Sequence, residues 1–187
     1  MNEGHLQVCA SPEWKEALRD LILPFALADA RLGDDVLEVG PGPGMTTDLL
    51  MAELPKLTCC ELDSDLATAL AERLAGTNVE VVNADATDMP FEDDRFSGAV
   101  SFSMLHHVPT SELQARVFTE VGRVLRPGAT FVASGSVPDD DLRAFHEGDI
   151  YNPIEPSAVG PRLEAAGFVD VDVRINDLGW AAHALAG

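Results

Sequence analysis

The sequence predicts an α/β fold: an open, doubly wound, mostly parallel sheet of seven strands, with helices on both faces and an antiparallel C-terminal hairpin strand. Short apolar runs rich in β-branched residues alternate with helical patterns between residues 34 and 134, and such alternation produces parallel strands joined by right-handed crossovers. The first apolar run leads directly into a glycine-rich turn. Two further strand-like runs close the chain, separated by a short polar turn, which is typical of a hairpin at a sheet edge.

The first part of the chain, residues 1–33, is expected to form a helical lid or cap. Residues 1–10 show no periodicity, whereas the following stretch carries apolar residues along one stripe. Ser11 is placed to cap this helix. Because Pro24 lacks a backbone N–H, we expect a kink there or two short helices. Such a segment can pack on the sheet or close over a ligand.

The chain is organised around a strand and turn that cover residues 36–44. Val36-Leu37-Glu38-Val39 fits a short strand that is covered on both faces. Glycines follow at alternate positions, and because they lack Cβ they let the turn adopt positive φ and a ligand approach the backbone. The turn is Gly40-Pro41-Gly42-Pro43-Gly44. A helical pattern begins at Met45, so strand, turn and helix together predict the opening of a nucleotide-binding βαβ unit.

The later elements alternate regularly. The strands expected after the first cover residues 57–61, 79–83, 99–105, 129–134, 168–175 and 179–185. Helices are expected to begin at Asp63-Ser64, Ser111 and Ser157, where a side chain can cap the first turn. Residues 34–187 would thus form the core, and the chain 1–187 is expected to be a single domain.

The connection of residues 135–156 is too long for an ordinary loop in a compact domain, so we expect it to be functional or mobile. It contains His146 and Tyr151, which are candidates for contact with a substrate.

Composition restricts the classes of partner. The formal net charge of −20 argues against nucleic acid and anionic membrane surfaces, both of which attract basic patches. Three cysteines, two of them adjacent, cannot form a disulfide framework. The absence of CxxC or His-rich spacing predicts no metal site. No long apolar run and no basic-then-apolar leader occur, so we expect a cytoplasmic protein.

Acidic residues stand where neighbouring parallel strands end, which is where open sheets bind ligands. Glu61 ends the second strand, and Asp85 follows the third. A carboxylate only accepts hydrogen bonds, so one of them can hold a ribose diol and the other an adenine amino group. Beside the glycine turn, this pair predicts an adenosine-containing cofactor.

A set of motifs narrows the choice of cofactor. The dinucleotide fingerprint would require glycine at position 45, which is Met45. The chain instead resembles the class I S-adenosylmethionine-dependent methyltransferases of the small-molecule type, which have a Rossmann-like core, over residues 34–134. The matching stretches are Val36–Gly44, Glu61–Asp63, Asn83–Phe91, Ser103–Val108 and Arg123–Gly128.

The resemblance implies S-adenosyl-L-methionine as cofactor and assigns roles by position. The glycine turn would pass beneath the methionine and ribose, with Glu38 orienting the turn or the cofactor's amino group. Leu62 would cover the adenine, and the backbone of Ala86 would meet a ring nitrogen. The implied cofactor-binding residues are Glu38, Gly40, Pro41, Gly42, Gly44, Glu61, Leu62, Asp85, Ala86 and Ser103. The family commonly has glycine at Ala129, a departure that touches a turn and not the site.

The implied reaction is methyl transfer to a nucleophilic oxygen, nitrogen or carbon of a small molecule, by a monomer or homodimer. No base constellation is evident, and His107, His146 and Tyr151 are only candidate catalytic residues, since a base must face the acceptor. Two alternatives stay open: a protein of this fold that binds the cofactor without transferase activity, and a nicotinamide-dependent oxidoreductase. Met45 and the lack of a Tyr-x-x-x-Lys pair argue against the oxidoreductase. An aminopropyl transferase would suit the acidic charge, but no acidic motif is placed for a polyamine.

Overall fold

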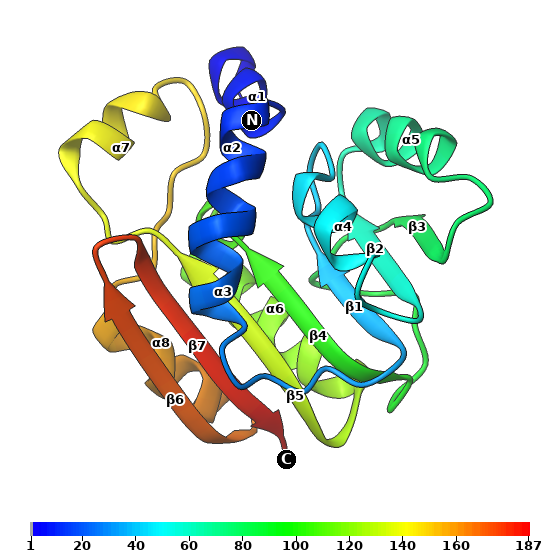
Figure 1. The fold of residues 1–187 in the computed structure, drawn as a ribbon. Coiled ribbons are helices and arrows are strands. Elements are labelled where there is room, and N and C mark those ends of the chain that lie inside the picture. The colour runs from blue at the N-terminus through cyan, green and yellow to red at the C-terminus, as the bar shows by residue number, and fades with distance from the viewer. Residues whose placement is uncertain (1) are drawn as a thin grey trace.

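A computed structural model describes residues 2–187, except for the side chain of Glu3. These residues form a seven-stranded sheet in the order β3-β2-β1-β4-β5-β7-β6, with helices on both faces (Figure 1). The strands are β1 (Val36–Val39), β2 (Leu57–Glu61), β3 (Val79–Asn83), β4 (Phe96–Phe102), β5 (Leu125–Gly135), β6 (Phe168–Asn176) and β7 (Gly179–Ala186). The predicted α/β sheet with its antiparallel C-terminal hairpin is confirmed.

The sheet reverses its order beside the first strand, and this reversal positions the candidate site. β1 pairs in parallel with β2 on one side and with β4 on the other. In open α/β sheets, a crevice forms at such a reversal, outside the carboxyl ends of the strands. β7 runs antiparallel between β5 and the edge strand β6, so the closing hairpin lies far from this crevice.

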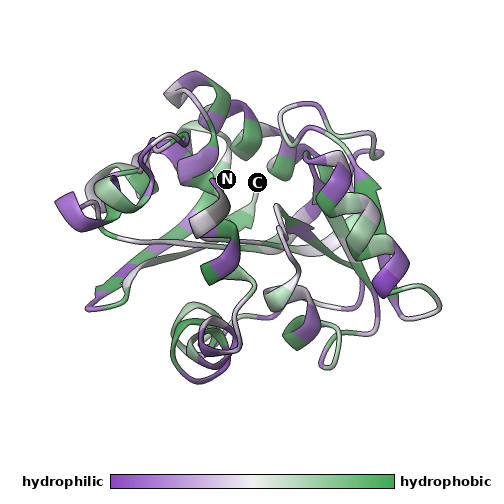
Figure 2. Cartoon of the chain, turned by 90° about the horizontal axis from the view of Figure 1, so that it is seen from above, coloured by the Kyte–Doolittle hydropathy of each residue, from purple (hydrophilic) through white to green (hydrophobic). Residues whose placement is uncertain are grey.

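Helices cover the sheet in two layers, each with its own apolar core (Figure 2). One layer packs Leu23, Leu50 and Leu70 against the sheet, and the other packs Phe118 and Leu163. The helices after the first strand are α4 (Met45–Leu50), α5 (Ser64–Arg73), α6 (Ser111–Val124), α7 (Asp140–Phe145) and α8 (Pro156–Ala165), with a short 3₁₀ turn η2 (Leu105–His107).

The N-terminal segment is helical from its first described turn. Residues 3–9, which show no periodicity, form α1 (Glu3–Cys9), and the side chain of its N-cap residue Asn2 accepts from the N–H of His5. Met1, the first residue of the expected lid, lies outside the described residues. After Ser11, which caps as predicted, a nearly continuous helix comprises α2 (Pro12–Ala17), the π-helical turn η1 (Leu18–Ile22) and α3 (Leu23–Ala26). The wider π turn accommodates Pro24, because a proline ring clashes with the carbonyl four residues earlier.

Several other features differ from expectation, and one of them is β5, which begins at Leu125 and not at residue 129. The fourth strand covers residues 96–102 and not 99–105, because Ser103 has φ of 52° and leaves the extended conformation. Thr110, and not Ser111, caps α6, since its hydroxyl accepts from the N–H of Leu113. The long connection contains the short helix α7, capped by Asp139. Among the described residues, no helix is long and apolar enough to cross a membrane.

Candidate functional site

The glycine turn takes the conformation that its composition predicts. Gly40, Gly42 and Gly44 have φ of 70°, 55° and 85°, a region that residues with a Cβ rarely adopt. A Cβ on Gly40 would collide with Cγ and Cβ of Met104, so the turn packs closely against the end of β4. Gly44 is the N-cap residue of α4. The backbone of the turn is thus exposed to a ligand on one side and tightly held on the other.

Glu38 lies behind this turn and is only 2% exposed. Its carboxylate accepts hydrogen bonds from the hydroxyls of Thr46 and Thr47, in the first turn of α4. Burial raises the pKa of the Glu38 carboxyl, against the opposing effect of the two threonine hydroxyls. Glu38 therefore anchors the helix that follows the turn, and it does not line the adjacent cavity.

The two acidic residues at the neighbouring strand ends face the same cavity. Glu61 accepts from the N–H of Gly42 at one oxygen and from the N–H of Asp63 at the other, each at 3.0 Å. The first bond fixes the glycine turn to the end of β2. Asp85 accepts at Oδ1 from the N–H and the hydroxyl of Thr87, both at 2.8 Å. Because a carboxylate offers about four lone-pair positions, each residue can still accept from a ligand.

Two further predicted residues are placed by local hydrogen bonds. The Nδ2 group of Asn83 donates to the carbonyls of Glu61 and Leu62 at 2.8 and 3.0 Å. This holds Leu62 at the cavity with 69% of its surface exposed, ready to cover a planar group. Ser103 donates its N–H to the Ser134 carbonyl at 3.0 Å. Its positive φ turns the chain out of β4 and toward the cavity, a strain of about 1–3 kcal/mol that is typical of functional sites.

A cavity of about 500 Å³ joins these groups. Eight of the ten predicted cofactor-binding residues line it, namely Gly40, Pro41, Gly42, Glu61, Leu62, Asp85, Ala86 and Ser103. The other two, Glu38 and Gly44, stand behind the turn that forms its floor. The acceptor capacity of Glu61 and Asp85, beside a backbone that a Cβ would obstruct, fits an adenosine group.

The outer wall of the cavity comes from the expected N-terminal lid and from the long connection of residues 135–156. The N-terminal helices contribute Cys9, Trp14 and Leu18, and the long connection contributes Asp149 and Ile150. Burial raises the pKa of the Cys9 thiol to about 11, so this cysteine is protonated and a poor nucleophile at neutral pH. No local motif marks these residues, because they reach the cavity only through tertiary packing.

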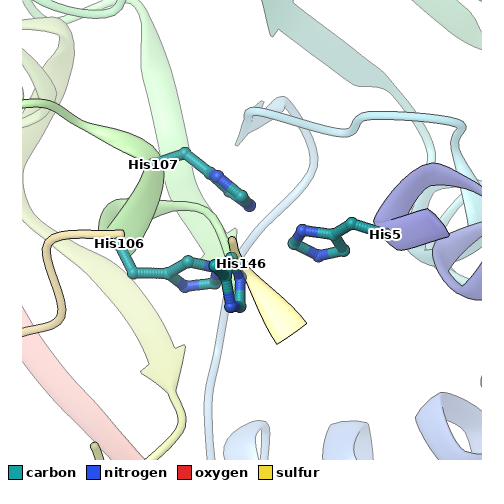
Figure 3. Close-up of side chains that lie close together, drawn as sticks. All are labelled: His5, His106, His107 and His146. Atoms are coloured by element: carbon teal, nitrogen blue, oxygen red, sulfur yellow. The ribbon is translucent and has the colours of Figure 1, made fainter. Parts of the chain in front are cut away.

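The histidines gather at this outer wall (Figure 3). His5 of α1, His106 and His107 of η2, and His146 after α7 point toward one another, with ligand nitrogens within 4.8 Å. Of the three candidate catalytic residues, His107 lines the cavity, whereas His146 and Tyr151 do not; their rings stack at 4.3 Å. His5 was missed, because residues 1–10 show no pattern.

Burial keeps three of these histidines neutral. It is the main cause that lowers the pKa of His106 to about 2 and that of His107 to about 4, and it also lowers the pKa of His5. A proton on one imidazole would also repel a proton on the next. None of these three histidines therefore carries charge at neutral pH.

The chain was compared with known proteins. A family model described as a methyltransferase domain matches residues 37–133. The chain is similar to a demethylmenaquinone methyltransferase of Clavibacter sepedonicus, with 32% identity over 64% of this chain and 45% of that protein. It is also similar to a probable tRNA methyltransferase 9B of Bos taurus, with 25% identity over 75% of this chain and 30% of that protein. The chain thus spans less than half the length of either relative.

Solved structures show the same fold. A SAM-dependent methyltransferase from Aquifex aeolicus superposes with a TM-score of 0.76 and 17% identity, covering all of both chains. The family match includes the glycine turn, Glu61 and Asp85, which follow β1, β2 and β3 at the carboxyl ends of these strands. The chain belongs to the methyltransferase domain family and is of the class I, S-adenosylmethionine-dependent type.

Proposed function

We propose that the protein transfers the methyl group of S-adenosylmethionine to a nucleophilic oxygen, nitrogen or carbon of a small molecule. The observation that carries the proposal is a single cavity with two unlike ends. Its floor is the glycine turn with two hydrogen-bonding acids, and its outer end is walled largely by apolar side chains, among them Trp14, Leu18 and Ile150. One end suits a polar nucleoside, and the other suits an apolar acceptor.

The residues would share the work of binding and alignment. When bound, the cofactor supplies a methyl group that is electrophilic because it is attached to a sulfonium. Glu61 would accept from the ribose hydroxyls and Asp85 from the adenine amino group, while Leu62 covers the ring. The N-terminal helices would exclude water and hold the acceptor in line, and alignment of this kind contributes several kcal/mol to catalysis.

A small acceptor is favoured over nucleic acid by charge. The chain has 12 basic and 32 acidic residues, whereas a protein that binds RNA neutralises phosphates with lysine and arginine. One similar protein is nevertheless described as a probable tRNA methyltransferase. The assay of transfer must therefore include an RNA substrate.

Binding is tested first. Calorimetry with S-adenosylmethionine and S-adenosylhomocysteine should give one site per chain, and Asp85→Ala should weaken it by about tenfold or more, since a hydrogen bond is lost. Asp88→Ala is the matched control, because Asp88 lies three residues later in the same loop and outside the cavity lining. No binding of either compound at millimolar concentration would reject the proposal, and equal affinity in the two variants would reject the role of Asp85.

Transfer is tested second, with S-adenosylmethionine labelled in its methyl group. Label should enter a small apolar acceptor from a panel of phenols, amines, carboxylic acids and hydroquinones, and mixed tRNA should stay unlabelled. If the label enters tRNA, the acceptor is RNA and the proposed small-molecule acceptor is wrong. Tight cofactor binding without product on any acceptor would favour a binding protein without transferase activity.

A further inference from the structure

The four histidines of the outer wall come from three distant parts of the chain. α1 supplies His5, the turn after β4 supplies His106 and His107, and the end of α7 supplies His146 (Figure 3). Their ring centroids lie between 4.2 and 6.2 Å apart. His5, His106 and His146 are 6%, 8% and 4% exposed. The contact between four histidine rings, three of them buried, calls for a physical explanation.

Five of the eight nitrogens in these four rings make no hydrogen bond to the described residues. Within the described part of the chain, Nδ1 of His5, Nε2 of His106, both nitrogens of His107 and Nε2 of His146 are buried without a hydrogen bond. Each buried polar atom left in this way destabilises the folded protein, because it has lost its hydrogen bonds to water. Native proteins rarely keep such groups together, and an unoccupied ion position is one recognised cause.

We propose that His5, His106, His107 and His146 bind one zinc ion or a similar borderline transition-metal ion. Neutral imidazole is the form that coordinates such metals. A tetrahedral zinc with Zn–N bonds of about 2.0–2.1 Å separates its ligand atoms by about 3.4 Å. The nitrogens already lie within 4.8 Å of one another, so side-chain rotations of modest size bring them to bonding distance.

The surroundings of the rings fit this assignment. Nδ1 of His146 lies 2.6 Å from the Leu142 carbonyl, and donation to this carbonyl leaves Nε2 free to bind a metal. A ligating histidine usually has such a second partner, which fixes its tautomer. Oδ2 of Asp149 stands 3.7 Å from Nδ1 of His5 and 3.9 Å from Nδ1 of His107. This carboxylate would offset part of the charge of the ion.

The metal would join the outer wall of the cavity into one unit. Its ligands connect α1 and the end of α7 to the turn after β4, and two of them, His5 and His107, line the cavity itself. Asn2 already links α1 to the long connection of residues 135–156, because its Nδ2 group donates to the carbonyls of Phe145 and Glu147. A site closed by four protein ligands has a structural role. This inference does not depend on which acceptor the enzyme methylates.

Metal binding is measured on the purified chain after treatment with a chelator. We expect one equivalent of Zn²⁺ to bind, with a rise in the thermal midpoint, and Mg²⁺ or Ca²⁺ at the same concentration to have no such effect because they prefer oxygen ligands. Co²⁺ should give the strong visible absorption of a tetrahedral site, without the near-ultraviolet band of a cobalt–thiolate bond. An apoprotein that takes up no Zn²⁺, or a spectrum with thiolate ligation, would overturn the proposal.

Variants locate the site. His146→Ala should weaken Zn²⁺ binding by about 100-fold or more, since even the loss of an outer partner costs 10–100-fold. His183→Gln is the control, because His183 is the fifth histidine and lies on β7, where it contacts the Ala26 carbonyl. In hydrogen exchange, Zn²⁺ should protect residues 3–9 and 140–149 of the wild type. Equal Zn²⁺ affinity in the two variants, or exchange in these segments that Zn²⁺ does not change, would contradict the assignment.

Discussion

At the scale of single residues, Glu38 shows how a motif position can be identified while its partners stay hidden. The sequence predicts that it orients either the turn or the cofactor's amino group. In the structure its carboxylate binds the hydroxyls of Thr46 and Thr47, so it orients the turn through the helix that follows. Threonines in a helix pattern give no sign that they face a buried acid. The role of Glu38 was therefore accessible from sequence only as a pair of alternatives.

The buried carboxyl of Glu38 should make stability depend on pH. Burial raises its pKa in the folded protein, so the folded state holds a proton that the unfolded state releases. Stability is thus lost as pH rises from the unfolded pKa of Glu, about 4.3, through the raised folded value. In Glu38→Gln this loss should disappear, because the threonine hydroxyls can rotate to serve the amide.

The measurement is the free energy of unfolding in urea for wild type and Glu38→Gln across this pH range. The difference between the two curves isolates Glu38 from all other carboxylates. A difference that stays constant with pH would show that Glu38 is ionised at no cost in the folded protein.

At the scale of elements, the strands and their mostly parallel arrangement followed from the alternating apolar pattern, but the strand order and the boundaries set by tertiary contacts did not. Ser103 reads as one more strand residue, yet its φ of 52° ends β4 there. In α1 the only local signal is the cap Asn2, and a helix of seven residues needs packing to be stable. Besides α2, it contacts residues beyond position 100, such as His106 and Phe145, which a local pattern cannot reveal.

The glycine turn offers a test of an element by paired substitutions. Gly40→Ala adds a Cβ at φ of 70° and against Cγ and Cβ of Met104, so backbone strain and overpacking should cost about 2–4 kcal/mol together. Gly76→Ala is the control, because Gly76 has φ of 81° and open space around it. Its free energy of unfolding should fall only by the backbone strain, about 1 kcal/mol.

Urea unfolding gives both values, and calorimetry should show that only Gly40→Ala loses cofactor affinity. If the two variants lose the same stability, close packing of the turn against β4 is not what requires glycine at position 40.

At the scale of the whole molecule, the two halves of the site differ in how far sequence could reach. The cofactor floor is built from consecutive strand ends, so Gly40, Glu61 and Asp85 could be placed together by topology alone. The outer wall joins His5 to His107 and His146, whose separation along the chain follows no spacing rule. The sequence therefore predicted the fold and the grouping of these three residues, whereas the outer wall of the cavity became visible only in the tertiary structure.

Net charge is a property of the whole chain and should weaken the fold by self-repulsion. At −20, added NaCl screens like charges, and the thermal midpoint should rise from its value at low ionic strength. Each kcal/mol gained corresponds to roughly 2–4 °C for a chain of this size. At mildly acidic pH the effect should shrink, because carboxylates take up protons. A midpoint that falls with NaCl at neutral pH would mean that attractive ion pairs outweigh the repulsion.

The position of Trp14 gives the molecule an optical reporter of its own. Trp14 lines the cavity, whereas Trp180, the other tryptophan, is 2% exposed in the core. Filling the cavity should therefore change the emission of Trp14 and leave that of Trp180 as an internal reference. Titration of S-adenosylhomocysteine should alter the fluorescence of Trp180→Phe but not that of Trp14→Phe. The same signal, followed in stopped flow, would time how fast a ligand enters the cavity.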